Sequence, residues 1–275
     1  MKTLNLIGAG KLGKVLGRLF YEHQVLRIQH IVCRNQEHGQ QAAAFIGDGQ
    51  AQVVTDWTLM QPADVVCLAV PDDAIVAVAE RLAQTGIIQQ GSIVFHCSGS
   101  KTSEILRALS ACGASVASVH PVKSFANPEK LILEFVGTLC GIEGDAYAVE
   151  QLSLVFERIG ARMLPISSKN KLTYHAGSVF ASNYLVSLME LAIQAYQHAG
   201  ISKEMAHELT QALATATLQN VFELGTKAAL TGPIQRGDMD TVQAQLTQLR
   251  STNEQLADMY QAFIAPTMQL AKQEK

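Results

Sequence analysis

Residues 3–13 read TLNLIGAGKLG, an apolar, strand-like run that ends in a G-x-G-x-x-G pattern. A helix-like run follows directly, over residues 14–20. A lone G-x-G-x-x-G is a weak signal, but strand, glycine turn and helix in this order are typical of the first part of a dinucleotide-binding βαβ unit. In such a unit, Gly8 allows the tight turn and Gly10 the close approach of a pyrophosphate. Gly13 lets the helix pack closely on the strand.

A second apolar run, residues 28–33, ends beside Arg34, which lies 21 residues after Gly13. NAD-binding units place Asp or Glu near this point, where the carboxylate meets the ribose hydroxyls. An arginine there can instead pair with two oxygens of a 2′-phosphate, so the sequence favours NADP(H). The alternative is a solvated arginine after an ordinary strand. We expect the cofactor to contact Gly8, Ala9, Gly10, Lys11, Leu12, Gly13, Arg34, Ala69, Val70 and Pro71.

Composition excludes several classes of function. The chain has 275 residues, 48% of them hydrophobic, a net charge of −3 and no dense cluster of Lys and Arg. We therefore expect neither nucleic acid nor a membrane as a partner. No unbroken apolar run nears the roughly 18 residues of a membrane-spanning helix, and the first strand begins too early for a signal peptide. The five cysteines form no C-x-x-C pair, which predicts a reducing cytoplasm and no metal site.

Strand and helix patterns alternate through about the first 165 residues and then give way to helical patterns alone. The first pattern predicts a mostly parallel sheet. The fold class is therefore α/β: a Rossmann-like, doubly wound, NADP-binding domain over residues 1–166, followed by an all-α domain over 167–275. Within the second domain we expect helices over about 169–198, 202–224 and 241–249. A capping box at residues 251–254 should begin the last helix.

The first of these helices carries a polar stripe on an otherwise apolar surface. Lys171, His175, Ser178 and Ser182 follow the spacing i, i+4, i+7 and i+11, which puts them on one face, with Asn183 beside the end. This stripe is either the solvent side of an amphipathic helix or the wall of a cleft. Small residues and a histidine, rather than Glu, Lys and Gln, favour the cleft.

Two loops that follow strands add polar groups, Ser98-Gly99-Ser100 and residues 120–125. Ligands of doubly wound sheets bind outside the carboxyl ends of the strands. Ser98, His120 and Ser124 are therefore predicted to bind substrate, together with Ser178 and Ser182. The alternative for the loops is ordinary turn chemistry.

Six segments together resemble one known group of proteins, described as Rossmann-like plus domain of unknown function 2520. They are GAGKLG, LAVPDDAI, HCSGS, SVHPVKSF, KLTYHAGSVFASNYLVSL and GPIQRGD. That group is similar in layout to 6-phosphogluconate dehydrogenase, other β-hydroxyacid dehydrogenases, pyrroline-5-carboxylate reductase and prephenate dehydrogenase. The resemblance implies an NADP oxidoreductase with its active site in a cleft between a nucleotide domain and a helical domain. His175 departs from the Asn of the hydroxyacid dehydrogenases, and Val122 from the H-P-M of the prephenate dehydrogenases.

The leading hypothesis is an NADP(H)-dependent reductase or dehydrogenase that moves a hydride to or from a carbonyl or imine carbon of a small metabolite. Lys171, His175 and Asn183 are its predicted catalytic residues, with Lys171 and His175 meeting one turn apart and sharing a proton. The alternative is a non-catalytic NADP(H)-binding regulator; a methyltransferase would need an acidic residue near Arg34. The apolar C-terminal helices predict a homodimer.

Overall fold

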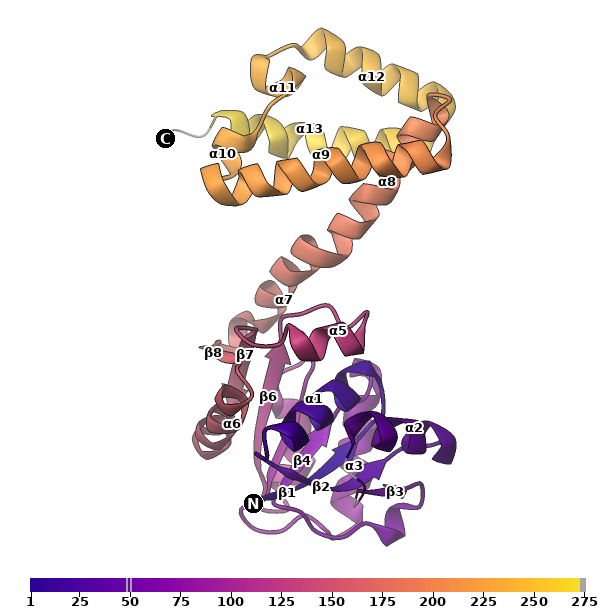
Figure 1. Cartoon of the computed structure of the whole chain (residues 1–275). Helices are drawn as coiled ribbons and strands as arrows, with labels where there is room; N and C mark the ends of the chain where they lie inside the picture. The colour runs from indigo at the N-terminus through magenta and orange to yellow at the C-terminus, as the bar shows by residue number, and fades with distance from the viewer. Residues whose placement is uncertain (48, 50, 273–275) are drawn as a thin grey trace. The chain divides into compact units, whose positions relative to one another are not determined.

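The computed structural model describes residues 1–47, 49 and 51–272, and it divides into two compact units, Met1–Val179 and Phe180–Lys275. The division falls after the helix α7 (Lys171–Val179), whereas the sequence predicted a boundary after residue 166. Figure 1 shows the elements of each unit in chain order.

The first unit is built on an eight-stranded sheet in the order β3-β2-β1-β4-β5-β6-β7-β8. Neighbouring strands are parallel except β6 and β7, which are antiparallel. The predicted mostly parallel, Rossmann-like sheet is therefore confirmed. The short strand β3 was not predicted. The strands are β1 (Thr3–Ile7), β2 (Arg27–Val32), β3 (Gln52–Val54), β4 (Val65–Leu68), β5 (Ile93–His96), β6 (Ser115–Pro121), β7 (Leu139–Gly144) and β8 (Arg162–Pro165).

Helices connect these strands and cover both faces of the sheet. The α-helices are α1 (Lys11–Glu22), α2 (Gln36–Ile46), α3 (Ile75–Gln84), α4 (Arg107–Ser110), α5 (Pro128–Leu133) and α6 (Ala146–Arg158). Short 3₁₀ helices are η1 (Trp57–Leu59), η2 (Asp72–Ala74), η3 (Ser103–Leu106) and η4 (Ser168–Asn170).

The side chains of each strand point alternately to the two faces of the sheet, and they form one hydrophobic core on each face. In β1, Leu4 and Leu6 belong to one core and Ile7 to the other, because successive side chains of a strand point to opposite faces. In the first core, Phe156 of α6 meets Phe20 of α1 and Phe95 of β5 edge-on, at ring-centroid distances of 5.5 and 5.8 Å. Such pairs fix the helices on this face.

The sheet order reverses between β1 and β4, and this reversal positions the site. The chain runs outward from β1 to β2 and β3, then returns across β1 to continue with β4, β5 and β6. Because these strands are parallel, their carboxyl ends lie along one edge of the sheet. A doubly wound sheet binds its ligand at this switch point.

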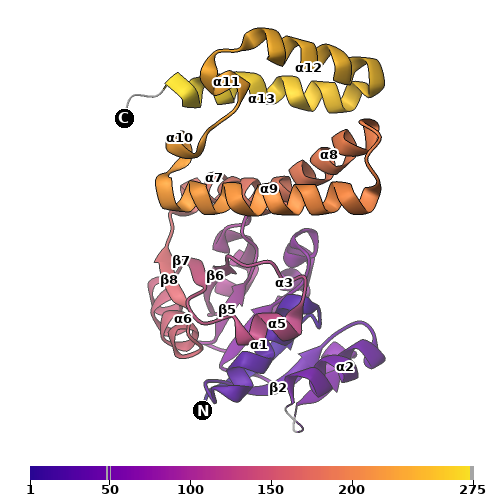
Figure 2. The ribbon, with the colours of Figure 1, turned by 45° about the horizontal axis from the view of Figure 1, so that its top comes forward.

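The second unit consists of the π-helix η5 (Phe180–Tyr184), α8 (Leu185–His198), α9 (Lys203–Leu224), α10 (Thr226–Ala229), α11 (Pro233–Arg236), α12 (Met239–Thr252) and α13 (Glu254–Lys272). Helices α12 and α13 lie side by side in both views (Figures 1 and 2). The predicted capping box is wrong: residues 251 and 252 end α12, and Asn253 caps α13, with its side chain accepting from the Leu256 backbone N–H at 3.0 Å.

Candidate functional site

The glycine turn after β1 has the geometry that a dinucleotide phosphate requires. Gly8 has a φ of +108°, and a Cβ there would collide with the Ala69 carbonyl. A Cβ at Gly13 would collide with the carbonyl of Gly8, so the start of α1 can lie against the turn only because both residues are glycines. Gly10 is different: nothing lies within 4 Å of the position that its Cβ would take.

Gly10 is also the residue immediately before α1. Because glycine has no side chain, the start of this helix has no side-chain cap. An uncapped helix N-terminus presents backbone N–H groups and a partial positive charge to an anion. Open space at Gly10 and free donors at α1 fit a pyrophosphate. Ala9 and Leu12 are half-buried beside the turn, and Lys11 is exposed with its Nζ donating to the Ala126 carbonyl at 2.8 Å.

The other predicted cofactor residues lie at the same edge of the sheet. Ala69 continues β4, and its N–H donates to the Ile7 carbonyl at 2.8 Å, which places Ala69, Val70 and Pro71 beside the glycine turn. Arg34 follows β2 with an exposed side chain, and it forms no ion pair within the described part of the chain. The guanidinium at this position suits a 2′-phosphate.

A hydrogen-bond network follows β5. The hydroxyls of Ser98 and Ser100 donate to Asp72 Oδ2 at 2.6 and 2.9 Å. His96 is fully buried below them, with Nδ1 accepting from the Ser98 N–H and Nε2 lying 3.1 Å from the Thr102 carbonyl. Both ring nitrogens are thus satisfied in a neutral imidazole. Burial is the main cause that lowers the pKa of His96 to about 4.

His120, Tyr174 and His175 form a second cluster, where the end of β6 meets α7. His120 Nδ1 lies 3.1 Å from the Tyr174 hydroxyl, and its ring is edge-on to that of His175, with centroids 5.6 Å apart. A Cβ on Gly99 would collide with both imidazoles, so the chain after β5 passes directly beneath them. Burial, followed by His175 and Lys171, lowers the pKa of His120 to about 4.

Lys171 lies elsewhere than the sequence predicted. Its Nζ donates to Glu143 Oε1 at 2.8 Å and to the Ser118 hydroxyl, and no part of its side chain is exposed. The backbone N–H of Ser103 donates to the same Oε1, and the hydroxyls of Ser103 and Ser168 donate to Oε2, each at 2.8 Å. The predicted partner, His175, is replaced by Glu143. A buried ammonium needs a carboxylate partner, and one lies opposite on β7.

Burial disfavours the charge of Glu143, but the Lys171 ammonium and the serine donors outweigh it and hold the pKa of Glu143 below its usual value. Burial lowers the pKa of Lys171, and Glu143 opposes that change. The pair therefore fastens the start of α7 to the sheet. Its burial speaks against the predicted role of Lys171 as a proton donor to substrate.

The remaining predicted site residues lie on different elements of the chain. Ser124 is exposed in the loop after β6, and Ser178 is half-buried on α7. Ser182 and Asn183 are exposed in the π-helix η5, in the second unit. The i→i+5 bonding of a π-helix adds a residue to its turn, so the stripe spacing assumed for an unbroken α-helix does not continue through Ser182.

Sequence reasoning missed Glu143 and Asp72 as members of these networks. A signal existed for Glu143: it is the single charge in the otherwise apolar strand β7. Among the described residues, no group of three or more His, Cys, Asp or Glu side chains could hold a metal ion.

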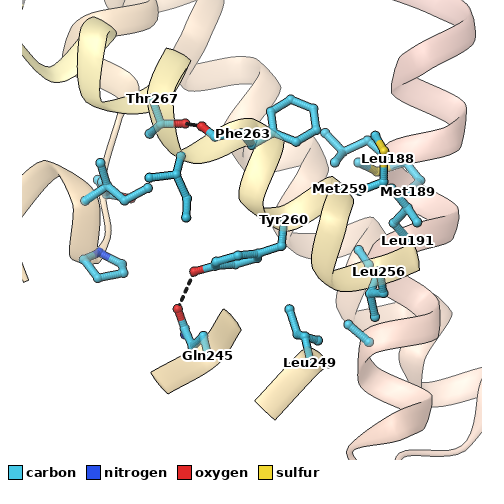
Figure 3. A pocket seen from close by; sticks show the side chains of 16 residues that line it. Leu188, Met189, Leu191, Gln245, Leu249, Leu256, Met259, Tyr260, Phe263 and Thr267 are labelled. Atoms are coloured by element: carbon cyan, nitrogen blue, oxygen red, sulfur yellow. Dashed lines mark hydrogen bonds between the residues drawn. The ribbon is translucent and has the colours of Figure 1, made fainter. Parts of the chain in front are cut away.

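The second unit contains an apolar pocket of about 400 Å³ (Figure 3). Its few polar groups include the Tyr260 hydroxyl, which donates to Gln245 Oε1 at 2.6 Å. Most of the lining comes from α8 and α13, with Leu188, Leu256, Met259 and Phe263 among its side chains.

Each half of the chain matches the model of a known protein domain. Residues 2–121 match the model of the Rossmann-like domain, and residues 138–266 match the domain of unknown function DUF2520. No curated protein matches the sequence.

Solved structures share the fold. Protein TM1727 from Thermotoga maritima is 24% identical over 98% of both chains, with a TM-score of 0.74. BF3122 from Bacteroides fragilis, a putative NADP oxidoreductase, is 19% identical over 98% of both chains, with a TM-score of 0.80. Pyrroline carboxylate reductase from Plasmodium falciparum, solved with NADP bound, is 13% identical over 98% of both chains, with a TM-score of 0.58. At these identities the likeness concerns the fold.

Proposed function

We propose that this chain, which belongs to the group that joins a Rossmann-like domain to the domain of unknown function 2520, is an NADP(H)-dependent oxidoreductase. It would move a hydride to or from a carbonyl or imine carbon of a small metabolite. One observation carries the proposal: a glycine turn with open space at Gly10 shares a sheet edge with His120, Tyr174 and His175. The groups proposed to bind phosphate and those proposed to transfer the proton therefore lie along the same edge of one sheet.

The cofactor would be held at three places along this edge. The N–H groups at the start of α1 would bind the pyrophosphate, and Arg34 would pair with the 2′-phosphate. Ala69, Val70 and Pro71 would line the path between the glycine turn and β5. When bound, NADPH supplies the hydride, and the protein supplies orientation and the proton.

His175 would assist proton transfer to or from the substrate, because its half-buried imidazole lies edge-on to that of His120 at the carboxyl end of β6. Ser98, His120, Ser124 and Ser178, all in the first unit, would orient the substrate. The Ser98 hydroxyl already donates to Asp72 and accepts from the Ser100 and Lys101 N–H groups, so Ser98 would orient the substrate through the loop that it holds.

A non-catalytic NADP(H)-binding regulator is the second candidate, and the placement of Lys171 favours it. The regulator would keep the glycine turn and Arg34 but would need no proton donor. Because Lys171 is buried in an ion pair with Glu143, one of the predicted proton donors does not reach a substrate.

We also propose a homodimer formed through the helices of the second unit. Large apolar side chains are exposed on η5, α8 and α9, including Phe180, Val186, Leu213 and Phe222 at 70, 70, 63 and 84%. The helical stretch Ser168–His198 is long and apolar enough to cross a membrane by length and composition, and none of its most apolar window is buried. Lys171 ties the start of this stretch to the sheet, so a protein partner accounts for the apolar surface better than a lipid does.

The proposed location is the cytoplasm. Cys33, Cys67, Cys97, Cys112 and Cys140 are all free thiols, and three of them are buried as small apolar side chains. This usage suits a reducing compartment.

The test is a screen of the purified protein for NADPH oxidation with a panel of small oxo acids, aldehydes and cyclic imines. We expect turnover with at least one class and a loss of that turnover, by about 10²- to 10⁴-fold, in His175→Asn. Tight NADPH binding without turnover of any panel member would favour the regulator.

A further inference from the structure

His120 and Tyr174 form a hydrogen bond that the roles assigned above leave unused. His120 Nδ1 lies 3.1 Å from the tyrosine hydroxyl, and the two rings meet edge-on with centroids 5.7 Å apart. Both side chains are half-buried. Their elements, β6 and α7, are far apart in sequence, and the hydrogen bond from Lys171 of α7 to the Ser118 hydroxyl of β6 holds these two elements together.

The surroundings indicate which partner donates. Burial raises the pKa of Tyr174, so its hydroxyl keeps its proton and can donate it to His120 Nδ1, 3.1 Å away. His120 is neutral, with its pKa at about 4, and a neutral imidazole carries one N–H. The proton therefore belongs on Nε2.

The Nε2 atom lies over the backbone at the carboxyl end of β5. A Cβ on Gly99 would come within 2.8 Å of both His120 Nε2 and Cε1, and it would also collide with the ring of His175. Glycine at this position lets the two imidazoles approach the chain that carries Ser98 and Ser100. The Nε2–H thus lies at the edge where ligands of this sheet type bind.

We propose that Tyr174 fixes His120 as the Nε2–H tautomer and that this N–H donates to the oxygen of the substrate, which is a carbonyl compound or the corresponding alcohol. The inference rests on the proposed function and narrows it. A neutral N–H needs a lone pair as its acceptor. A carbonyl or hydroxyl oxygen offers one, whereas the nitrogen of a protonated imine carries a hydrogen and has none.

The reduction balances with these groups alone, besides the hydride of NADPH and solvent water. The carbonyl carbon gains the hydride and its electron pair, and the π pair of the C=O bond moves to oxygen. The oxygen then forms its O–H bond with the proton of His120 Nε2. Nδ1 takes the Tyr174 proton as Nε2 releases its own. Nε2 then takes a proton from water and Nδ1 returns its proton to Tyr174, which restores the Nε2–H tautomer. The alcohol is the product, one solvent proton is consumed, and oxidation reverses each transfer.

Ring nitrogen NMR of the full chain, labelled with ¹⁵N-histidine, tests the tautomer directly. The His120 signals are assigned from their loss in His120→Asn. We expect a protonated Nε2 and a bare Nδ1 at pH 7, with no charging until the pH approaches 4. The charged or titratable groups that face the ring are His175, Tyr174 and Lys171 of α7 and Asp72 of η2. Tyr174→Phe should abolish the tautomer preference, whereas Tyr147→Phe, on the exposed surface of α6, should preserve it.

A His120 that carries its proton on Nδ1, or that titrates near its ordinary pKa in the wild type, overturns the inference. The substrate screen gives the second readout. Carbonyl compounds should be reduced, and His120→Asn should lower kcat by about 10²- to 10⁴-fold with NADPH affinity within about twofold of wild type. Reduction of imines alone overturns the inference and leaves the proposed function intact. Absence of NADPH binding overturns both.

Discussion

The glycines of the turn after β1 perform different tasks, although the sequence pattern makes them look equivalent. Gly8 and Gly13 are required by the fold, because added side chains would collide with backbone carbonyls. Gly10 faces open space, and we propose that the bound nucleotide is what requires a glycine there. The difference can be measured with matched substitutions at two of the three positions.

Gly10→Val should keep the thermal stability of the wild type and lose NADPH binding, because the new side chain would occupy the space proposed for the pyrophosphate. Gly13→Val should instead lower the unfolding temperature, because its side chain collides with Gly8. Thermal denaturation and fluorescence titration with NADPH separate the two effects. Normal NADPH affinity in Gly10→Val would show that the turn is not the phosphate site.

His96 should make the protein lose stability in mild acid. Its pKa is about 4 in the folded chain and about 6.5 when unfolded, so the unfolded state binds more protons between these values. The stabilisation is complete above pH 6.5 and is lost as the pH falls toward 4, by on the order of 3 kcal/mol. Urea unfolding at pH 7 and pH 4.5 should give a smaller difference for His96→Asn than for wild type; an equal difference would contradict this assignment.

At the residue scale, sequence spacing predicted which positions share a helix face but not what each side chain meets. Lys171 and His175 are one helical turn apart, as expected, yet the ammonium reaches Glu143, 28 residues earlier in the chain. That contact depends on the antiparallel pairing of β6 and β7, which places Glu143 opposite Ser118. Local periodicity carries no information about such a pairing.

At the scale of elements, the buried ion pair is the anchor of α7. Lys171→Met should destabilise the protein by about 3–5 kcal/mol, because it leaves the Glu143 carboxylate buried without its counter-charge. The double variant Lys171→Met/Glu143→Gln should recover much of this loss, because the uncompensated charge is gone. Chemical denaturation measures both. A single variant as stable as wild type would show that the pair does not anchor the helix.

The elements themselves were predictable where their pattern was strong. The strands β1, β4 and β5 are buried on both faces, and their apolar runs identify them. β3 has three residues, too few for a pattern to emerge. The sequence misplaced the end of α12 because Ser251 and Asn253 are both residue types that cap helices. In the structure Asn253 lies in the turn between α12 and α13 and is the residue that caps α13.

At the scale of the whole molecule, the sequence pattern predicted a mostly parallel sheet followed by helices, and the structure confirms this fold class. The second unit buries few side chains within the described residues: Ala206, Thr210, Val242, Leu246, Leu256 and Ala257. So small a core fits the proposed homodimer, in which a second copy would cover the exposed apolar side chains.

Light scattering at micromolar concentration should therefore give the mass of a dimer. Replacing two exposed apolar residues of α9, Leu213→Asp and Phe222→Asp, should shift the protein toward monomer, because charge at a buried interface is costly. Leu133→Asp is the matched control, since this leucine is 86% exposed on α5 of the first unit. A wild-type monomer would contradict the proposed assembly.

Equilibrium titration with NADPH and NADH tests most directly whether the chain uses NADP(H). NADPH should bind more tightly, and Arg34→Ala should weaken NADPH by roughly 1–3 kcal/mol while leaving NADH nearly unchanged. Arg27→Ala, at the opposite end of β2, is the control and should change neither affinity. Equal affinity of the wild type for both nucleotides would contradict the role of Arg34, and binding of neither would contradict the account as a whole.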